Sequence, residues 1–131
     1  MDKRQFDGCA VLIVEDEVVI LMDLQTTFEA AGARVITASR LEDALALTGA
    51  LKLDAAVIDF GLGSDDSDVV CCRLTTLGIP FVFHSGRAHE TAFKWPDAPF
   101  VGKPAHPEDL LQAVASVICR TTHHAAEVRQ G

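Results

Sequence analysis

The chain has 131 residues, of which 49% are apolar, and 11 Lys and Arg against 19 Asp and Glu give a formal net charge of −8. This length and apolar content suit one globular domain with its own core, and they exclude a wholly disordered chain. The acidic balance argues against a nucleic-acid-binding surface, since phosphate contacts need clustered Lys and Arg. No apolar run approaches the roughly 20 residues of a membrane span, and the polar start is unlike a signal peptide. We therefore expect a cytoplasmic protein that binds neither nucleic acid nor membrane.

The first half of the chain predicts two strand–helix pairs. The run 9–14 is apolar throughout, as in a strand buried on both faces. Residues 17–31 predict an amphipathic helix, because apolar side chains recur at steps of three and four, and Gly32 is a natural stop. A strand over 34–38 and a helix over 41–51 follow.

The second half continues the alternation. A buried strand over 55–58 precedes a Gly-rich loop and a helix over 67–77, and a strand over 80–84 comes next. The segment 87–97 has poor periodicity, so any fourth helix is short or degenerate. A brief strand over 98–102 and a helix from Pro107 to about 120 form the last pair.

Two smaller features complete the pattern. Ser39 and Glu42 have the spacing of a capping box at the start of the second helix. No two cysteines are spaced as C-x-x-C, and we expect all of them to be reduced and mostly buried: Cys9, Cys71, Cys72 and Cys119.

Strand–helix alternation with fully apolar strands predicts an α/β (βα)₅ three-layer sandwich, built on a five-stranded parallel sheet. The domain spans 9–121, with an N-terminal extension over 1–8 and a flexible C-terminal tail over 122–131. Sheets of this kind bind ligands at the carboxyl ends of their strands.

Polar side chains stand at these strand ends. Glu15 and Asp16 follow the first strand, Asp59 the third, Ser85 the fourth and Lys103 the fifth. Three carboxylates at one sheet edge would repel one another, and a divalent cation with a preference for oxygen ligands, Mg²⁺ or Mn²⁺, would relieve that repulsion. An Asp carboxylate can attack phosphorus, and a transferring phosphoryl group needs a metal, a cation and a hydroxyl donor.

Four short motifs at successive strand ends carry a family resemblance: Val14–Glu17, Ile58-Asp59, His84–Gly86 and Lys103-Pro104. In this order they resemble the receiver domain of two-component response regulators. The resemblance implies the flavodoxin-like strand order 2-1-3-4-5. It also implies that Asp59 accepts a phosphoryl group from a sensor histidine kinase or a histidine phosphotransfer protein.

The resemblance assigns roles to further residues. Glu15, Asp16, Asp59 and the backbone carbonyl of Gly61 would hold Mg²⁺. Ser85 and Lys103 would contact the phosphoryl group, and Phe100 matches the position of the aromatic switch residue. The protein would be a phosphoacceptor switch with Mg-dependent autophosphorylation and autodephosphorylation, and not an enzyme that turns over a metabolite.

The chain also departs from the family. The loop after Asp59 lacks the Pro and the Met-Asp-Gly turn that many receivers have, and 87–97 forms a helix poorly. We therefore expect a modified output face on Phe93, Trp95, Phe100 and the last helix. The sequence ends about ten residues after that predicted helix, which favours a stand-alone receiver, monomeric or weakly dimeric, that controls a protein partner.

Two other classes remain as alternatives. A receiver-like module could bind proteins without phosphorylation, although the acidic pair, Asp59, Ser85 and Lys103 argue against this. A flavodoxin-like FMN protein would need a Gly- and hydroxyl-rich phosphate loop after the first strand. Glu15, Asp16 and Glu17 stand there instead and would repel a flavin phosphate.

Overall fold

The protein folds around one parallel sheet. A computed structural model describes residues 5–59, 64–85, 95, 97–103 and 106–130, and excludes the side chains of 64–66, 85 and 120–130. The five strands lie in the order β2-β1-β3-β4-β5, which confirms the predicted order. Their bounds are β1 Ala10–Val14, β2 Arg34–Ala38, β3 Ala55–Ile58, β4 Phe81–Ser85 and β5 Phe100–Gly102.

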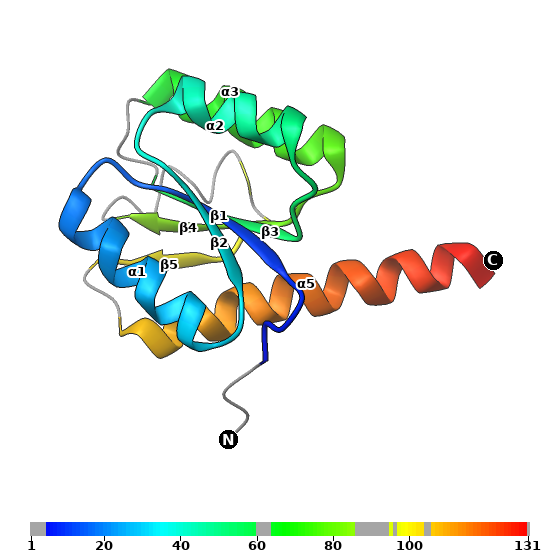
Figure 1. The fold of residues 1–131 in the computed structure, drawn as a ribbon. Coiled ribbons are helices and arrows are strands. Elements are labelled where there is room, and N and C mark those ends of the chain that lie inside the picture. The colour runs from blue at the N-terminus through cyan, green and yellow to red at the C-terminus, as the bar shows by residue number, and fades with distance from the viewer. Residues whose placement is uncertain (1–4, 60–63, 86–94, 96, 104–105, 131) are drawn as a thin grey trace.

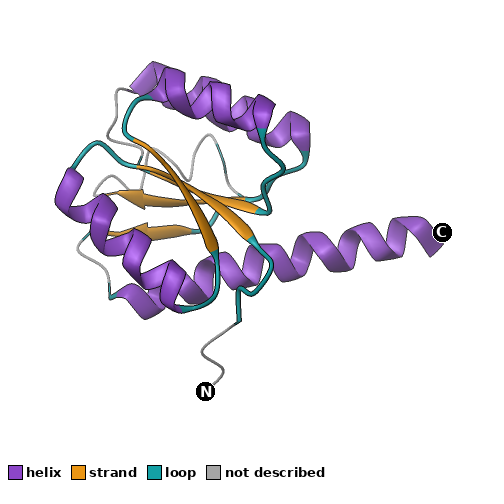
Figure 2. Ribbon diagram, viewed as in Figure 1, coloured by secondary structure: helices purple, strands orange, loops and turns teal. Residues whose placement is uncertain are grey.

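Helices cover both faces of the sheet. Figure 1 shows α2 and α3 on one face and α1 and α5 on the other, and Figure 2 shows the sheet between the two helical layers. The bounds of these helices are α1 Val18–Ala30, α2 Leu41–Ala50, α3 Ser64–Leu77 and α5 Pro107–Gln130. The predicted three-layer α/β sandwich is therefore confirmed.

Alternation of the strand side chains divides the core in two. Leu12 and Phe83 point into a cluster on the α2–α3 side, where they meet Leu74 of α3. Val11 and Val82 point the other way, into a second cluster that contains the buried residues of α1 and α5. Because β1 and β3 are buried on both faces, their sequences are apolar at every position.

Glycines end two helices as the sequence predicts. Gly32, after α1, has a φ of +99°, and a Cβ there would lie 2.6 Å from Asp7 Oδ1. Gly78, after α3, has a φ of +74°. Left-handed backbone of this kind costs glycine little and other residues more.

The start of α2 at Leu41 is confirmed, but its predicted cap and the predicted start of the third helix are wrong. The N-cap of α2 is Arg40, and its side chain makes no capping hydrogen bond. Glu42 is therefore the second helical residue rather than the third, so the capping box with Ser39 does not form, and Glu42 pairs with Arg40 instead. The third helix begins at Ser64 rather than at residue 67, with Asp65 and Asp66 in its first turn, where acidic residues suit the helix dipole.

The two ends of the chain have structure that the sequence patterns did not indicate. Phe6, within the predicted N-terminal extension, is 1% exposed and packs on Phe28 of α1, with ring centroids 5.5 Å apart. At the other end α5 continues to Gln130, past the predicted boundary at 121. No Gly or Pro interrupts the sequence between 108 and 130, so nothing forces the helix to stop.

The cysteines are only partly as expected. All four are free, but Cys71 alone is buried, Cys9 is half-buried, and Cys72 and Cys119 are exposed. The two exposed cysteines lie on outward faces of α3 and α5, which a count of apolar residues does not distinguish from inward ones. The predicted short fourth helix falls on 87–97, most of which lies outside the described residues.

Candidate functional site

The backbone of the sheet brings three acidic residues to one edge. Glu15 follows β1, and its N–H donates to Ala38 O of β2 at 3.0 Å. Asp59 follows β3, and its N–H donates to Val14 O of β1 at 3.0 Å. Each residue thus continues the hydrogen-bonding pattern of the sheet by one step, which fixes both side chains at the carboxyl ends of adjacent strands.

The three carboxylates converge there. Glu15, Asp16 and Asp59 each offer an oxygen, and these oxygens lie within 4.8 Å of one another. Glu15 is 1% exposed and Asp59 5%, whereas Asp16 is exposed. Glu15 Oε1 also accepts a hydrogen bond from the backbone N–H of Glu17 at 3.2 Å, which orients the buried carboxylate.

Lys103, directly after β5, reaches two of these carboxylates. Its Nζ lies 3.1 Å from Glu15 Oε2 and 3.3 Å from Asp59 Oδ2. It also donates a hydrogen bond to Glu15 Oε1 at 3.3 Å. Glu15 Oε2 is held by the ion pair but accepts no hydrogen bond of good geometry from the described residues.

The surroundings of Glu15 and Lys103 shift the pKa values of both side chains. Burial, and then the negative charge of Asp59, raises the pKa of Glu15 to about 7, against the opposing effect of Lys103. Burial opposes the charge of Lys103, but its hydrogen bond to Glu15 and the charges of Asp59 and Glu15 outweigh burial, so the pKa of Lys103 is raised. One ammonium therefore does not fully compensate the carboxylates that surround it.

The donor set fits a hard divalent cation. Three carboxylates supply only oxygen ligands, and one buried oxygen of Glu15 lacks a hydrogen bond. Mg²⁺ and Mn²⁺ prefer such oxygen ligands. Of the predicted ligands, Glu15, Asp16 and Asp59 are brought together, and Gly61 lies outside the described residues.

Comparisons with known proteins agree with this geometry. Residues 11–115 match the family model of the response regulator receiver domain. The chain belongs to this receiver family. A search of curated proteins gives no significant match.

Solved structures share the fold of this receiver. A response regulator receiver protein from Sinorhizobium medicae is similar with a TM-score of 0.80 and 25% identity, covering 86% of this chain and 96% of that one. A CheY-like receiver domain protein from Methanospirillum hungatei has a TM-score of 0.79 and 22% identity, covering 88% and 98%. A response regulator receiver protein from Burkholderia phymatum has a TM-score of 0.72 and 19% identity, covering 85% of this chain and 95% of that one.

The remaining predicted site residues have less defined surroundings. Ser85 ends β4 opposite Gly102 of β5, at the same sheet edge as the carboxylates, and its side chain is outside the description. Phe100, the candidate switch residue of the receiver, is half-buried and packs against the core on the α2–α3 side.

Trp95 is half-buried and has contacts inside the receiver. Its ring packs edge-on against Phe81 with centroids 5.8 Å apart, and its Nε1–H donates to Asp68 Oδ1 of α3 at 3.3 Å. The predicted output face on Phe93, Trp95, Phe100 and the last helix stays a prediction, in which Trp95 also has contacts inside the protein. Phe93 lies outside the described residues.

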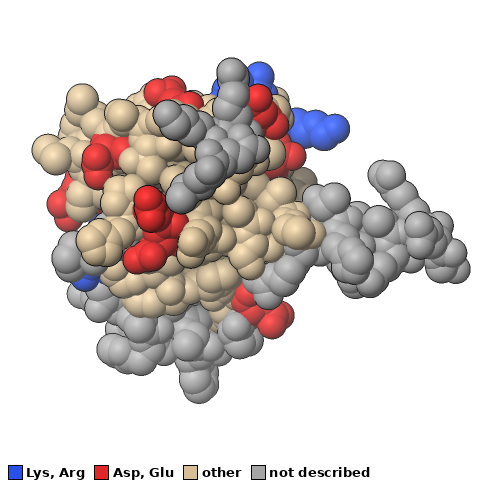
Figure 3. All heavy atoms as spheres, turned by 90° about the horizontal axis from the view of Figure 1, so that it is seen from below, with Lys and Arg blue, Asp and Glu red and all other residues tan. Residues whose placement is uncertain are grey.

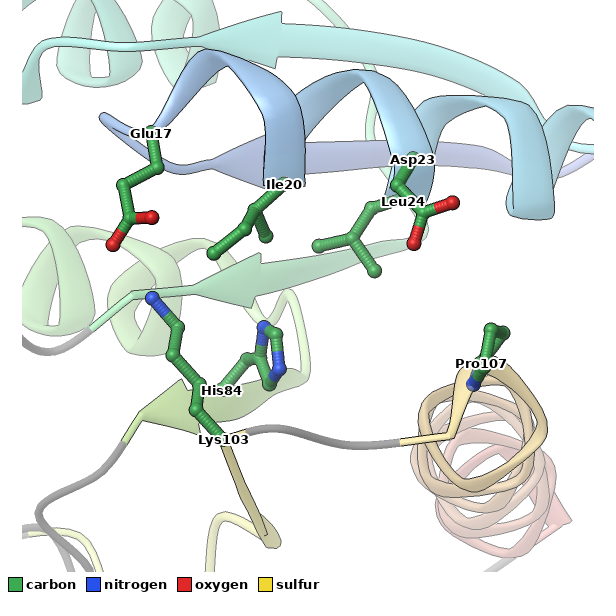
Figure 4. Close-up of a pocket in the computed structure, with 7 residues that line it drawn as sticks. All are labelled: Glu17, Ile20, Asp23, Leu24, His84, Lys103 and Pro107. Carbon is green, nitrogen blue, oxygen red and sulfur yellow. The ribbon is translucent and has the colours of Figure 1, made fainter.

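The structure has a cleft beside the receiver site that the sequence did not predict. This cleft has a volume of about 420 Å³ and is lined by side chains of α1, of the ends of β4 and β5, and of the start of α5 (Figure 4). His84 and Lys103 form one wall, and Glu17, the N-cap of α1, and Asp23 of α1 lie opposite. The first two belong to motifs visible in the sequence, but nothing there indicates that α1 closes over them.

Proposed function

We propose that the chain accepts a phosphoryl group on Asp59 from the phosphohistidine of a sensor histidine kinase or a histidine phosphotransfer protein, and that it thereby controls a protein partner. The observation that carries the proposal is the convergence of Asp59, Glu15 and Asp16 within 4.8 Å, with Lys103 in contact with two of them. A lone surface carboxylate would not need this surrounding.

The transfer forms one bond and breaks another. An oxygen of the Asp59 carboxylate forms the O–P bond as the N–P bond of the donor breaks, and the bonding pair stays on the imidazole nitrogen. Lys103 Nζ, 3.3 Å from Asp59 Oδ2, offsets the charge on the transferring oxygens. Ser85, at the same edge, donates a hydrogen bond to the phosphoryl group. Hydrolysis later returns the carboxylate and inorganic phosphate, so the protein is a switch and not an enzyme of metabolism.

Glu15, Asp16 and Asp59, with the carbonyl of Gly61, would hold Mg²⁺ or Mn²⁺. When bound, the ion supplies positive charge next to the phosphoryl oxygens. Without it, burial and then the negative charge of Asp59 raise the pKa of Glu15.

The response to phosphorylation is a shift between two conformations. The phosphoryl group favours the conformation in which Ser85 and Lys103 contact it, and the inward turn of Phe100 accompanies that shift. Phe100 pairs with Phe83 across β4 and β5, so a movement of Ser85 at the end of β4 has a short route to it.

Phosphorylation with a small donor tests the proposal. We expect acetyl phosphate with Mg²⁺ to shift the wild-type chain on a phosphate-affinity gel, whereas Asp59→Asn gives no shift and chelator abolishes it. Asp43→Asn, on exposed α2, is the matched control and should shift as wild type does. No shift in the wild type, or an equal shift in Asp59→Asn, would favour the alternative of a phosphorylation-independent binding module.

The working environment of the protein is part of the proposal. Among the helices in the described part of the chain, none is long and apolar enough to cross a membrane. The face on which α1 and α5 lie carries scattered Asp and Glu, with Lys and Arg at its edge (Figure 3). We place the protein in the cytoplasm as a monomer or weak dimer. Size-exclusion chromatography with and without the phosphodonor tests the oligomeric state.

A further inference from the structure

Trp95, the one tryptophan of the chain, connects two elements that lead to the phosphoacceptor site. Its indole Nε1–H donates to Asp68 Oδ1 of α3 at 3.3 Å. Its backbone carbonyl accepts a hydrogen bond from Ala98 N–H at 3.1 Å, so a single turn of chain separates it from β5. Trp95 and Asp68 are both half-buried, and a hydrogen bond is stronger there than in open water. A movement of β5 relative to α3 therefore acts directly on this bond.

The same two elements lead to the two partners of an ion pair in the site. Along the chain, α3 is the first helix after Asp59, and β5 ends directly before Lys103. Lys103 Nζ lies 3.3 Å from Asp59 Oδ2. The ion pair and the indole hydrogen bond thus join the same two parts of the molecule at two separate points.

Phosphorylation of Asp59 changes this ion pair. The new O–P bond removes the negative charge of the carboxylate, and the charge then lies on the phosphoryl oxygens, further from the end of β3. The ammonium of Lys103 follows that charge, because a charge-assisted hydrogen bond is stronger than one to a neutral carbonyl. The end of β5, which carries Lys103, is thereby drawn to a new position relative to Asp59 and to α3.

Trp95 also packs in the cluster that Phe100 enters when it turns inward. Phe81 packs edge-on against Phe83 and against Trp95, with ring centroids 5.6 and 5.8 Å apart. Phe100 lies opposite Phe83 in the register of β4 and β5 and packs against the same cluster. A packed core has little spare volume, so a further ring displaces one that is already there. Phe81 and Phe83 are buried in β4, which leaves half-buried Trp95 as the ring that can move.

We propose that the hydrogen bond from Trp95 to Asp68 belongs to the unphosphorylated conformation and is lost when Asp59 carries a phosphoryl group. The inference rests on the proposed function, since phosphorylation of Asp59 is its trigger. A bond that is present in only one of two conformations favours that conformation. The Trp95–Asp68 bond therefore opposes the switch, and by linkage its removal strengthens the binding of a phosphoryl group at Asp59.

The single indole group allows a direct test on the full ¹⁵N-labelled chain. Acetyl phosphate with Mg²⁺ should move the indole N–H resonance upfield and speed its exchange with water, because the proton loses its acceptor. Asp59→Asn should show neither change. A resonance that stays in place while the phosphate-affinity gel shows phosphorylation overturns this inference alone. A gel without a shift overturns the proposed function, and the inference with it.

The affinity for beryllofluoride, a stable analogue of the phosphoryl group, measures the coupling at equilibrium. With Mg²⁺ present, Trp95→Phe should bind it about fivefold more tightly than wild type does, which corresponds to the usual net contribution of one hydrogen bond. Asp68→Ala should have a similar effect. The double variant should bind no more tightly than either single variant, since the two side chains share one bond.

Thr75→Val is the matched control. It removes a hydrogen bond from Thr75 Oγ1 to Cys71 O on the same helix without changing a partner of Trp95, so beryllofluoride should bind as it does to wild type. A loss of packing alone would leave the affinity of Trp95→Phe unchanged or weaken it. Equal or weaker binding by Trp95→Phe, or additive effects in the double variant, would thus overturn the inference.

Discussion

Glu15 illustrates how a single side chain can be unfavourable for the fold and necessary for the site. It is 1% exposed, lies beside Asp59, and has a pKa of about 7 because burial and that neighbour disfavour its charge. Lys103 compensates it only in part. A buried carboxylate in this state reduces stability whenever it must be ionised.

The stability of the metal-free protein should therefore depend on pH. The folded state holds a proton on Glu15 that the unfolded state releases near its ordinary pKa of 4.5. The contribution of Glu15 to stability should thus be complete below pH 4.5 and be lost as pH rises through about 7. Urea denaturation in chelator across this window tests the sign, and Glu15→Gln should flatten the profile. A wild-type profile that Glu15→Gln leaves unchanged would contradict it.

The same substitution should act in opposite directions on stability and on metal binding. At pH 8 in chelator, Glu15→Gln should stabilise the fold by about 1 to 3 kcal/mol, since one pKa unit corresponds to about 1.4 kcal/mol. With Mg²⁺, wild type should gain stability by mass action and the variant less. Glu17→Gln, exposed and outside the carboxylate cluster, is the control and should behave as wild type.

The packing of the N-terminal segment is a feature that sequence patterns do not mark. Phe6 stands alone between polar residues, so no periodic pattern marks it, yet its N–H donates to Ala31 O at 2.9 Å and its ring fills the core beneath α1. A single anchoring side chain of this kind carries no spacing signal.

Phe6→Ala should destabilise the protein by about 3 to 5 kcal/mol, the usual cost of removing a buried phenyl ring. Chemical denaturation measures it. Gln5→Ala, exposed and adjacent, should change stability by less than about 0.5 kcal/mol. Similar stability of Phe6→Ala and wild type would mean that the segment does not belong to the core.

Trp95 connects the segment before β5 to α3 by a hydrogen bond. Trp95→Phe keeps an aromatic ring against Phe81 but loses the hydrogen bond to Asp68, and we expect a cost of about 1 kcal/mol. Asp68→Asn should cost less, because its amide oxygen can still accept. Thermal unfolding of both variants compares them, and a larger loss in Asp68→Asn than in Trp95→Phe would show that this bond is not the main contribution.

Helix and strand periods located every described element, and the bounds of β2 and β3 are as predicted, but some helix ends are not. The predicted start of α3 is one turn too late, because the acidic residues before 67 fit a loop and a first helical turn equally well. Only tertiary packing decides between these two conformations. The capping box failed by one residue for the same reason.

At the scale of the whole molecule, α5 extends beyond the body that it packs against (Figure 1). Its buried positions within the described side chains are Leu110, Val114 and Val117, all in its first half. Deleting residues 122–131 should therefore change the melting temperature by less than about 2 °C, since little burial is lost. Leu110→Ala should lower it by far more. A large loss on deletion would show that the distal half packs in solution.

The overall topology was the most predictable property and the cleft the least. Apolar strands separated by helices permit few arrangements, and placing polar residues at strand ends predicts the carboxylates and Lys103 without coordinates. The acidic residues of the cleft lie on one side of a helix. Whether that side faces solvent or the end of a neighbouring strand depends on packing distances, which cannot be predicted from a single sequence.

The ion pairs from Lys103 to Glu15 also have a consequence during synthesis of the chain. These residues are 88 positions apart, so a growing chain has the carboxylates long before it has their cation. Until β5 emerges from the ribosome and joins the edge of the sheet, the three carboxylates lack the ammonium of Lys103. An unfinished or prematurely terminated chain therefore has the acidic residues of the site without their cation, and only a chain that has completed the sheet has both.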